Sequence, residues 1–207
     1  MSNFILTLDK LMCLLWITTY SLALIGTIKY RYPLIAPMTQ AIIAPFEFAV
    51  FIGYIINGNL NLGYVSLSYV YWTAIEICII VVMIKNGYII KQHIAPYLLF
   101  VCTLTAIMCY LVAVKGHMFF FSYFNTFIGE IIWFSLILKK DYPMKPIALA
   151  MFITKFVGDA ISIPTYLGDG IWLINAICIL LPILDLLFIL VYIHRKNKSK
   201  QVSVSGD

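Results

Sequence analysis

The chain contains 207 residues, of which 63% are hydrophobic and 11% are charged. A soluble domain carries about 25% charged residues, so this composition excludes a soluble globular protein and predicts an integral, multi-pass membrane protein. The net charge of +5 does not indicate nucleic-acid binding, because the basic residues lie in the turns between apolar segments. The five cysteines form neither a CxxC motif nor a Cys/His ligand spacing, and we therefore expect no metal centre.

Seven apolar segments are long enough to cross a bilayer as helices, because about 20 residues span the hydrocarbon. Short turns rich in Gly, Pro, Lys and Asn separate these segments. The sequence therefore predicts an all-α fold in which residues 1–193 form one compact seven-transmembrane-helix bundle with antiparallel, packed neighbours. The expected helices cover about residues 11–28, 34–57, 65–84, 96–114, 119–138, 146–167 and 171–193.

The distribution of basic residues predicts the orientation of the bundle. Of the 14 lysines and arginines, all except Lys10, Lys115 and Lys155 follow the first, third, fifth or seventh segment. Basic residues gather on the cytoplasmic side, so we expect the N-terminus outside and the C-terminus in the cytoplasm. Residues 194–207 are expected to be a disordered, basic cytoplasmic tail near anionic lipid. The membrane would be the plasma membrane in a bacterium and the endoplasmic reticulum in a eukaryote.

Ionisable residues lie deep in five of the seven segments, where each costs about 2.5–3.5 kcal/mol unless it is paired, protonated or hydrated. Together they predict a shared polar interior. The two in the sixth segment are four residues apart and can form an ion pair on one helix face, which either orients the helix or positions a ligand. The acid in the fifth segment either bonds a neighbouring helix or takes part in the chemistry, and the first is favoured. The six residues are Glu47, Glu76, Glu130, Lys155, Asp159 and Asp185.

Aromatic residues accompany these acids inside the segments. A buried acid is favoured in its neutral form and can donate a proton, and aromatic faces stabilise cations by about 2 kcal/mol when water is excluded. Such a pocket suits carbocation chemistry on a hydrophobic substrate, although aromatic residues in membrane helices also face lipid. The candidate pocket rings are Trp16, Tyr20, Phe46, Tyr69, Trp72, Tyr123, Trp133 and Phe188.

An ordered set of motifs along nearly the whole chain resembles the small seven-helix integral-membrane terpene cyclases of fungal meroterpenoid and indole-diterpene pathways and their bacterial relatives. The set comprises an aromatic pair and basic turn in the first segment, an aromatic-Glu pair in the second, and a Trp with a polar residue four later in the third. A Thr-Lys-Phe-Val-Gly-Asp stretch in the sixth and an Asp before an aromatic residue in the seventh complete it. The matching residues are Trp16, Tyr20, Lys29, Arg31, Phe46, Glu47, Trp72, Glu76, Lys85, 154–159, Asp185, Phe188 and 192–195.

The resemblance implies that Glu47 donates the proton and that Asp185 is a second essential carboxylate. The implied reaction is protonation of a terminal alkene or epoxide on a prenyl chain, followed by cyclisation and loss of a proton. No cofactor or metal is implied, and the sequence contains no DDxxD run for magnesium and diphosphate. The expected partners are the bilayer and a hydrophobic, prenylated small molecule, which would reach the interior sideways between helices.

Other classes of membrane protein share some of these features. Buried carboxylates also form proton relays, so a proton-coupled small-solute transporter or channel is the main alternative. A microbial rhodopsin needs a lysine in its last helix, whereas the intramembrane lysine here, Lys155, lies in the sixth segment. A structural membrane protein remains a third reading.

Overall fold

The computed structural model describes residues 3–56, 64–115, 118–166 and 172–204. These residues form seven α-helices and one short 3₁₀ turn, and they contain no strand. The elements are α1 (Asn3–Tyr30), α2 (Pro37–Ile56), α3 (Tyr64–Lys85), η1 (Lys91–His93), α4 (Ile94–Lys115), α5 (Met118–Ile137), α6 (Pro146–Tyr166) and α7 (Trp172–Val204). The predicted all-α fold is thus confirmed.

Five of these helices contain stretches that are long and apolar enough to cross a membrane: Phe4–Tyr30, Leu67–Lys85, Lys91–Leu111, Pro146–Pro164 and Trp172–Lys198. In α2 the apolar stretch is shorter and covers Pro37–Gly53. The chain therefore has the character of a multi-pass membrane protein. Many large apolar side chains are exposed on its helices, as expected for surfaces that face lipid and not water.

The first and last helices are longer than the sequence analysis predicted. The expected bounds were 11–28 and 171–193, but α1 begins at Asn3 and α7 continues to Val204. The prediction of a disordered tail over 194–207 is therefore corrected for residues 194–204, while 205–207 lie outside the described residues. Hydropathy marks only the membrane-embedded part of a helix, and polar residues with fair helix propensity can continue it beyond the apolar stretch. No Gly or Pro lies between Pro182 and Gly206.

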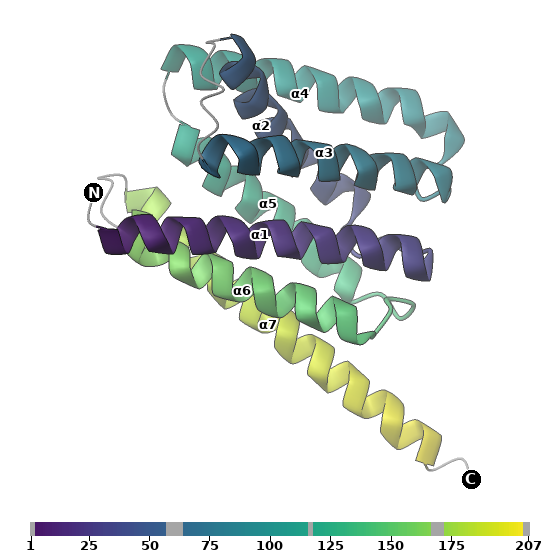
Figure 1. The fold of residues 1–207 in the computed structure, drawn as a ribbon. Coiled ribbons are helices and arrows are strands. Elements are labelled where there is room, and N and C mark those ends of the chain that lie inside the picture. The colour runs from purple at the N-terminus through teal and green to yellow at the C-terminus, as the bar shows by residue number, and fades with distance from the viewer. Residues whose placement is uncertain (1–2, 57–63, 116–117, 167–171, 205–207) are drawn as a thin grey trace.

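Six helices pack side by side in a closed ring: α1 contacts α3 and α6, α7 contacts α6 and α5, and α2 contacts α5 and α3. The remaining helix, α4, packs mainly on the outside of α2 (Figure 1). Within the described residues, α1 has little contact with α2, and α3 has little with α4. The expectation that chain neighbours pack together therefore holds for α2–α3 and α6–α7 but not throughout.

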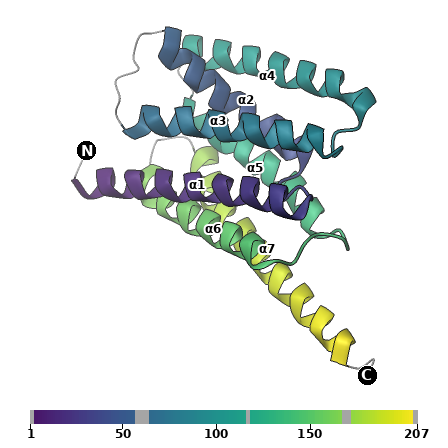
Figure 2. The same ribbon diagram turned by 45° about the vertical axis from the view of Figure 1, so that its right-hand side comes forward.

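Successive helices run in alternating directions, so the N- and C-termini lie at opposite ends of the molecule (Figures 1 and 2). The turns after α1, α3 and α5 meet at the C-terminal end through a tyrosine cluster. The ring centroid of Tyr32 lies 6.2 Å from that of Tyr88 and 5.9 Å from that of Tyr142. At the same end Lys145 Nζ lies 5.9 Å from the ring centroid of Tyr30. The basic turns identified in the sequence are thus gathered on one face.

Hydrogen bonds between side chains and partners on other helices fix the ring. Thr39 Oγ1 on α2 donates to the carbonyl oxygen of Gly129 on α5 over 2.8 Å. Trp133 Nε1 on α5 donates over 2.6 Å to the carbonyl oxygen of Leu34, just before α2. Thr19 and Thr154 share a hydroxyl contact of 2.9 Å between α1 and α6. Such polar contacts hold helices together in a medium where apolar burial provides little driving force.

Candidate functional site

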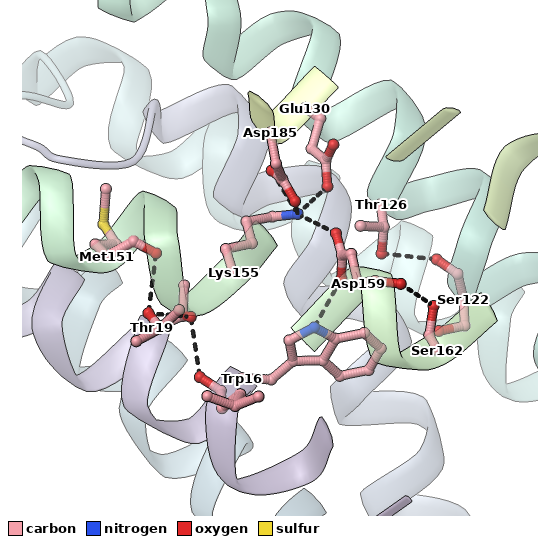
Figure 3. A network of polar contacts seen from close by, with 12 residues as sticks. Trp16, Thr19, Ser122, Thr126, Glu130, Met151, Lys155, Asp159, Ser162 and Asp185 are labelled. Carbon is pink, nitrogen blue, oxygen red and sulfur yellow. Dashed lines mark hydrogen bonds and ion pairs between the residues drawn. The ribbon is translucent and has the colours of Figure 1, made fainter. Parts of the chain in front are cut away.

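A lysine surrounded by three carboxyl groups occupies the ring interior (Figure 3). Lys155 Nζ on α6 contacts Glu130 Oε1 on α5, Asp159 Oδ2 at 2.6 Å and Asp185 Oδ1 on α7 at 3.2 Å. All four residues are buried. The predicted pairing of Lys155 with Asp159, four residues later, is confirmed. Acids from two more helices, α5 and α7, also pair with Lys155. We call these four residues the Lys155 cluster.

The Lys155 cluster has one cation for three acids. Oxygen atoms of Glu130, Asp159 and Asp185 lie within 4.8 Å of one another, a grouping that can surround a cation. The ammonium group of Lys155 lies among them. Two net negative charges would remain if all three carboxyl groups were ionised. Burying unbalanced charge is costly, so protons held on the cluster lower its free energy, and the site can exchange them.

An indole from α1 extends the Lys155 cluster. Trp16 Nε1 donates to Asp159 Oδ1 over 2.7 Å. Gly158, the residue before this aspartate, lets α1 approach α6 closely, because a β-carbon at position 158 would lie 2.8 Å from Trp16 Cδ1 and 2.9 Å from Nε1. The Gly158-Asp159 pair therefore positions the indole and accepts its hydrogen bond.

Substituting Gly158 by alanine should weaken this contact. The new methyl group must displace the indole from Asp159, and overpacking of this kind costs about 1–3 kcal/mol. Thermal unfolding of the purified protein in detergent measures the loss. Gly53→Ala on α2 is the matched control, since a β-carbon at Gly53 meets nothing within 4 Å. Equal unfolding temperatures for the two variants would contradict the assigned contact.

A small central cavity of about 30 Å³ lies next to the Lys155 cluster. It has room for about two water molecules. The residues that line it come from α1, α2, α3, α5 and α6 and from the turn before α2. They include the acids Glu47 and Asp159, Lys155, the rings of Trp16, Tyr20, Trp72 and Trp133, and the hydroxyl residues Thr19, Ser122 and Thr126. Acidic, basic, hydroxyl and aromatic groups thus surround one small space.

Two further acids in the interior have no ion-pair partner among the described residues. Glu47 lines the central cavity, and its Oε2 atom is buried without a hydrogen bond within the described structure. Both carboxyl oxygens of Glu76 and both polar side-chain atoms of Gln40 are likewise buried, and these two side chains lie near each other without a hydrogen bond of normal geometry. Glu47 and Glu76 are close enough that their charges would repel each other if both were ionised. These acids are therefore the groups most available for proton transfer.

The structure divides the eight candidate rings into two groups. Trp16, Tyr20, Trp72 and Trp133 line the central cavity, and the rings of Trp16 and Trp72 lie 5.9 Å apart. The other four pack in apolar clusters within the bundle and are not part of the cavity lining. Phe46 and Tyr69 pack beside Trp72, Tyr123 packs against α7, and Phe188 packs 5.6 Å from Trp133.

The two acids that the resemblance marks also occupy different environments. Glu47 lines the cavity. Asp185 is not part of the cavity lining, but its carboxyl group forms an ion pair with Lys155. Both face the space enclosed by the six-helix ring. Lys155, the partner of Asp185, lines the same cavity as Glu47.

A second, larger hollow lies on the outside of the ring. It is an apolar groove of about 910 Å³ between α3 and α4, with α2 as its floor. Phe48 and Phe51 contribute from α2, Ile77 and Ile84 from α3, and Leu98 from α4. Its volume falls in the range of small-molecule sites, about 300–1,000 Å³. We call this hollow the α3–α4 groove.

Comparison of the chain with protein-family models, with curated proteins and with solved structures found no match. The functional argument therefore rests on the residues themselves and on the motif resemblance given above.

Sequence reasoning missed part of the site. The hydroxyl residues of the cavity, Thr19, Ser122 and Thr126, carry no distinctive pattern, because serine and threonine are common in membrane helices. The approach of Glu130 and Asp185 to one lysine joins residues far apart in the chain. The only sequence signal was that each of these residues lies far from the ends of its apolar segment. That signal did not specify which of the ionisable residues would contact one another.

Proposed function

We propose that the chain is a membrane terpene cyclase in which Glu47 protonates a terminal alkene or epoxide on a prenyl chain. The observation that carries the proposal is the state of Glu47. Its carboxyl group has a buried oxygen without a hydrogen-bond partner in the described structure, at a cavity lined by Trp16, Tyr20 and Trp72. An unpaired acid beside aromatic faces supplies both a proton and stabilisation for the cation that the proton creates.

The proposed reaction starts when the π electrons of the alkene take the Glu47 proton, leaving a carboxylate and a carbocation. For an epoxide, proton transfer to oxygen and cleavage of a C–O bond give the same type of cation. The π electrons of a second alkene of the chain attack this carbon, so a C–C bond closes the ring and the positive charge moves to the other carbon of that alkene. Loss of a proton from a neighbouring carbon then forms a new alkene. The Glu47 carboxylate formed in the first step is the available base. The product is an isomer of the substrate.

In this proposal the Lys155 cluster positions the cavity wall. Asp185, the second acid implied by the resemblance, holds Lys155, and Lys155 in turn holds Asp159 against Trp16. These contacts join α1, α6 and α7, and the pair of Lys155 with Glu130 adds α5. Asp185 therefore acts in the proposal through the lysine, and not by direct contact with the substrate.

The proposal includes the topology predicted from the sequence: seven spans, an external N-terminus and a cytoplasmic C-terminus. It is supported by the alternating helix directions and by the gathering of the basic turns at one end. The location would be a multi-pass position in the plasma membrane or the endoplasmic reticulum. The substrate would be a prenylated small molecule dissolved in the bilayer.

Feeding experiments test the proposed activity. Membranes containing the chain are incubated with farnesylated or geranylgeranylated aromatic acceptors and with their terminal epoxides, and extracts are analysed by mass spectrometry. We expect a new compound of unchanged mass and different retention time. Membranes without the chain are the control. Absence of any such isomer with every acceptor and epoxide would contradict the proposal.

A proton-coupled transporter or channel is the second candidate, and the central cavity favours it. The cavity has room for about two water molecules, and acids, a lysine and hydroxyl groups line it, whereas cyclisation needs the helices to separate around a prenyl chain. Such an arrangement can conduct protons. Proteoliposomes with an internal pH dye distinguish the two functions, because a transporter acidifies the lumen under an imposed gradient and changes no covalent bond. A cyclase produces an isomer without proton flux.

A further inference from the structure

The α3–α4 groove lies between two consecutive helices that do not pack on each other. The short 86–93 segment joins α3 and α4, yet within the described residues they have little direct contact, and each packs against α2 instead. The walls of the gap between them are almost entirely apolar. Apolar hollows do not hold water, and an empty hollow of this size would forfeit close packing. We therefore expect the groove to hold a hydrophobic occupant from the bilayer.

The length of the groove identifies the kind of occupant. On α3 its lining runs from Thr73 to Ile84, next to the 86–93 segment, and at 1.5 Å per residue this stretch is about 17 Å long. The hydrocarbon core of a bilayer is about 30 Å thick. The groove therefore covers about one leaflet, as the acyl chain of a single lipid does. A partner helix that crosses the membrane would need a groove along the full thickness.

The end of the groove at the 86–93 segment is basic. Lys85 directly follows the lining residue Ile84, and Lys91 lies in η1, just before α4. Both lysines are exposed, and neither forms an ion pair within the described residues. The sequence contains no acid between Glu76 and Glu130, so no carboxylate from this segment or from α4 offsets the two charges. Lysines near the membrane surface attract anionic head groups.

A hydrogen-bonded turn keeps these two lysines at the same end of the groove. Gly87 has a φ of 75°, a left-handed conformation that glycine adopts at little cost. The Tyr88 N–H donates to the Met83 carbonyl oxygen over 3.0 Å, a bond that closes the C-terminus of a helix. The chain reverses direction there, so Lys91 returns to the end of α3 where Lys85 lies.

We propose that the α3–α4 groove is a binding site for an anionic phospholipid of the leaflet at the Lys85 end. One acyl chain lies between α3 and α4, and the phosphate group lies at Lys85 and Lys91. The bound chain supplies the packing that the two helices do not make with each other. A zwitterionic phospholipid has the same chains but no net charge for the lysines, so the site selects the anionic lipid. This site is separate from the central cavity and does not depend on the cyclase function.

Native mass spectrometry of the full chain, purified in detergent without added lipid, measures the affinity of the first bound lipid. Dioleoyl phosphatidylglycerol and dioleoyl phosphatidylcholine have identical acyl chains and differ in net charge. We expect phosphatidylglycerol to bind about tenfold more tightly. Lys85→Gln and Lys91→Gln should each weaken its binding about fivefold and leave phosphatidylcholine binding unchanged. Lys198→Gln, at an exposed position on α7, which packs against α5 and α6, is the matched control and should change neither affinity.

Two cysteines of the chain locate the bound lipid. Cys102 is exposed and lines the groove, whereas Cys78 on α3 is exposed and does not line it. Alkylation by N-ethylmaleimide is followed at both residues by peptide mass spectrometry. Phosphatidylglycerol at about ten times its Kd should slow alkylation of Cys102 about tenfold and leave the Cys78 rate unchanged. Ala106→Trp, at an exposed groove position, should abolish this protection, whereas Ile107→Trp, exposed on α4 outside the groove lining, should not.

Equal affinity of the native chain for the two lipids would overturn the proposal. Phosphatidylglycerol binding that leaves the Cys102 rate unchanged would also overturn it, because the lipid would then lie elsewhere on the bundle. The same holds if the Lys85→Gln and Lys91→Gln proteins bind phosphatidylglycerol as tightly as the native chain does. Selective binding that protects Cys102 in the native chain and in Ile107→Trp, but not in Ala106→Trp, supports the site.

Discussion

Glu47→Gln should reduce formation of the cyclised isomer by about 10²–10⁴-fold, the usual contribution of a general acid. Glutamine has nearly the same shape but no proton of comparable acidity. Because Glu47 Oε2 has no hydrogen bond within the described structure, the substitution breaks no contact there, and the fold should persist. Isomer formed per mole of inserted protein, measured by liquid chromatography and mass spectrometry, gives the loss.

Asp185→Asn provides the contrasting case. Its carboxyl group pairs with Lys155, so this substitution should lower the unfolding temperature together with the activity. Glu47→Gln should lower only the activity. A Glu47→Gln protein that keeps native turnover would remove Glu47 from the role of proton donor.

Lys155→Met should cause the largest loss of stability among single substitutions in the ring interior. It leaves Glu130, Asp159 and Asp185 without their shared cation, and removing one partner of a buried ion pair costs about 3–5 kcal/mol. The cluster joins α5, α6 and α7, so the loss should appear as a lower unfolding temperature of the whole protein. Unfolding in detergent, followed by circular dichroism, measures the effect.

Neutralising the acids should restore part of that stability. Lys155→Met combined with Glu130→Gln, Asp159→Asn and Asp185→Asn removes all three acids together with the cation, and the combined variant should unfold at a higher temperature than Lys155→Met alone. Lys85→Met, at an exposed position outside the cluster, is the control and should unfold like the native chain. A Lys155→Met protein as stable as that control would show that the cluster does not hold the bundle.

The fold followed from hydropathy because membrane helices satisfy their own backbone and need only apolar length. The bounds of α2 to α6 lie close to the predicted ones, and the errors fall at the ends of α1 and α7. There each helix continues beyond the apolar stretch into polar residues, which hydropathy does not assign to a span. The order of packing was not predictable, because the close contact of α1 with α6 depends on small residues such as Gly158.

The candidate site was partly predictable from local spacing. Lys155 and Asp159 are four residues apart, and helix geometry alone brings them together. To predict that Glu130 and Asp185 also contact Lys155, one must know where two other helices lie, which spacing in the sequence does not give. Only some of the predicted pocket rings line the cavity, because hydrophobicity does not tell which face of a membrane helix meets a cavity. Trp72 lines the cavity, whereas Phe46 packs in the apolar cluster beside Trp72.

The most direct test of proton donation by Glu47 is a turnover experiment in deuterated water. The protein in nanodiscs is exchanged into D₂O and given less than one equivalent of a geranylgeranylated acceptor or its epoxide, so that each molecule turns over at most once, and the product is analysed by mass spectrometry. We predict that the product from the alkene is one mass unit heavier than the substrate, because a deuteron adds to the terminal alkene and a proton leaves. That label should be absent with Glu47→Gln. An isomer that forms from the alkene without deuterium, or equally in the variant, would contradict initiation by this acid.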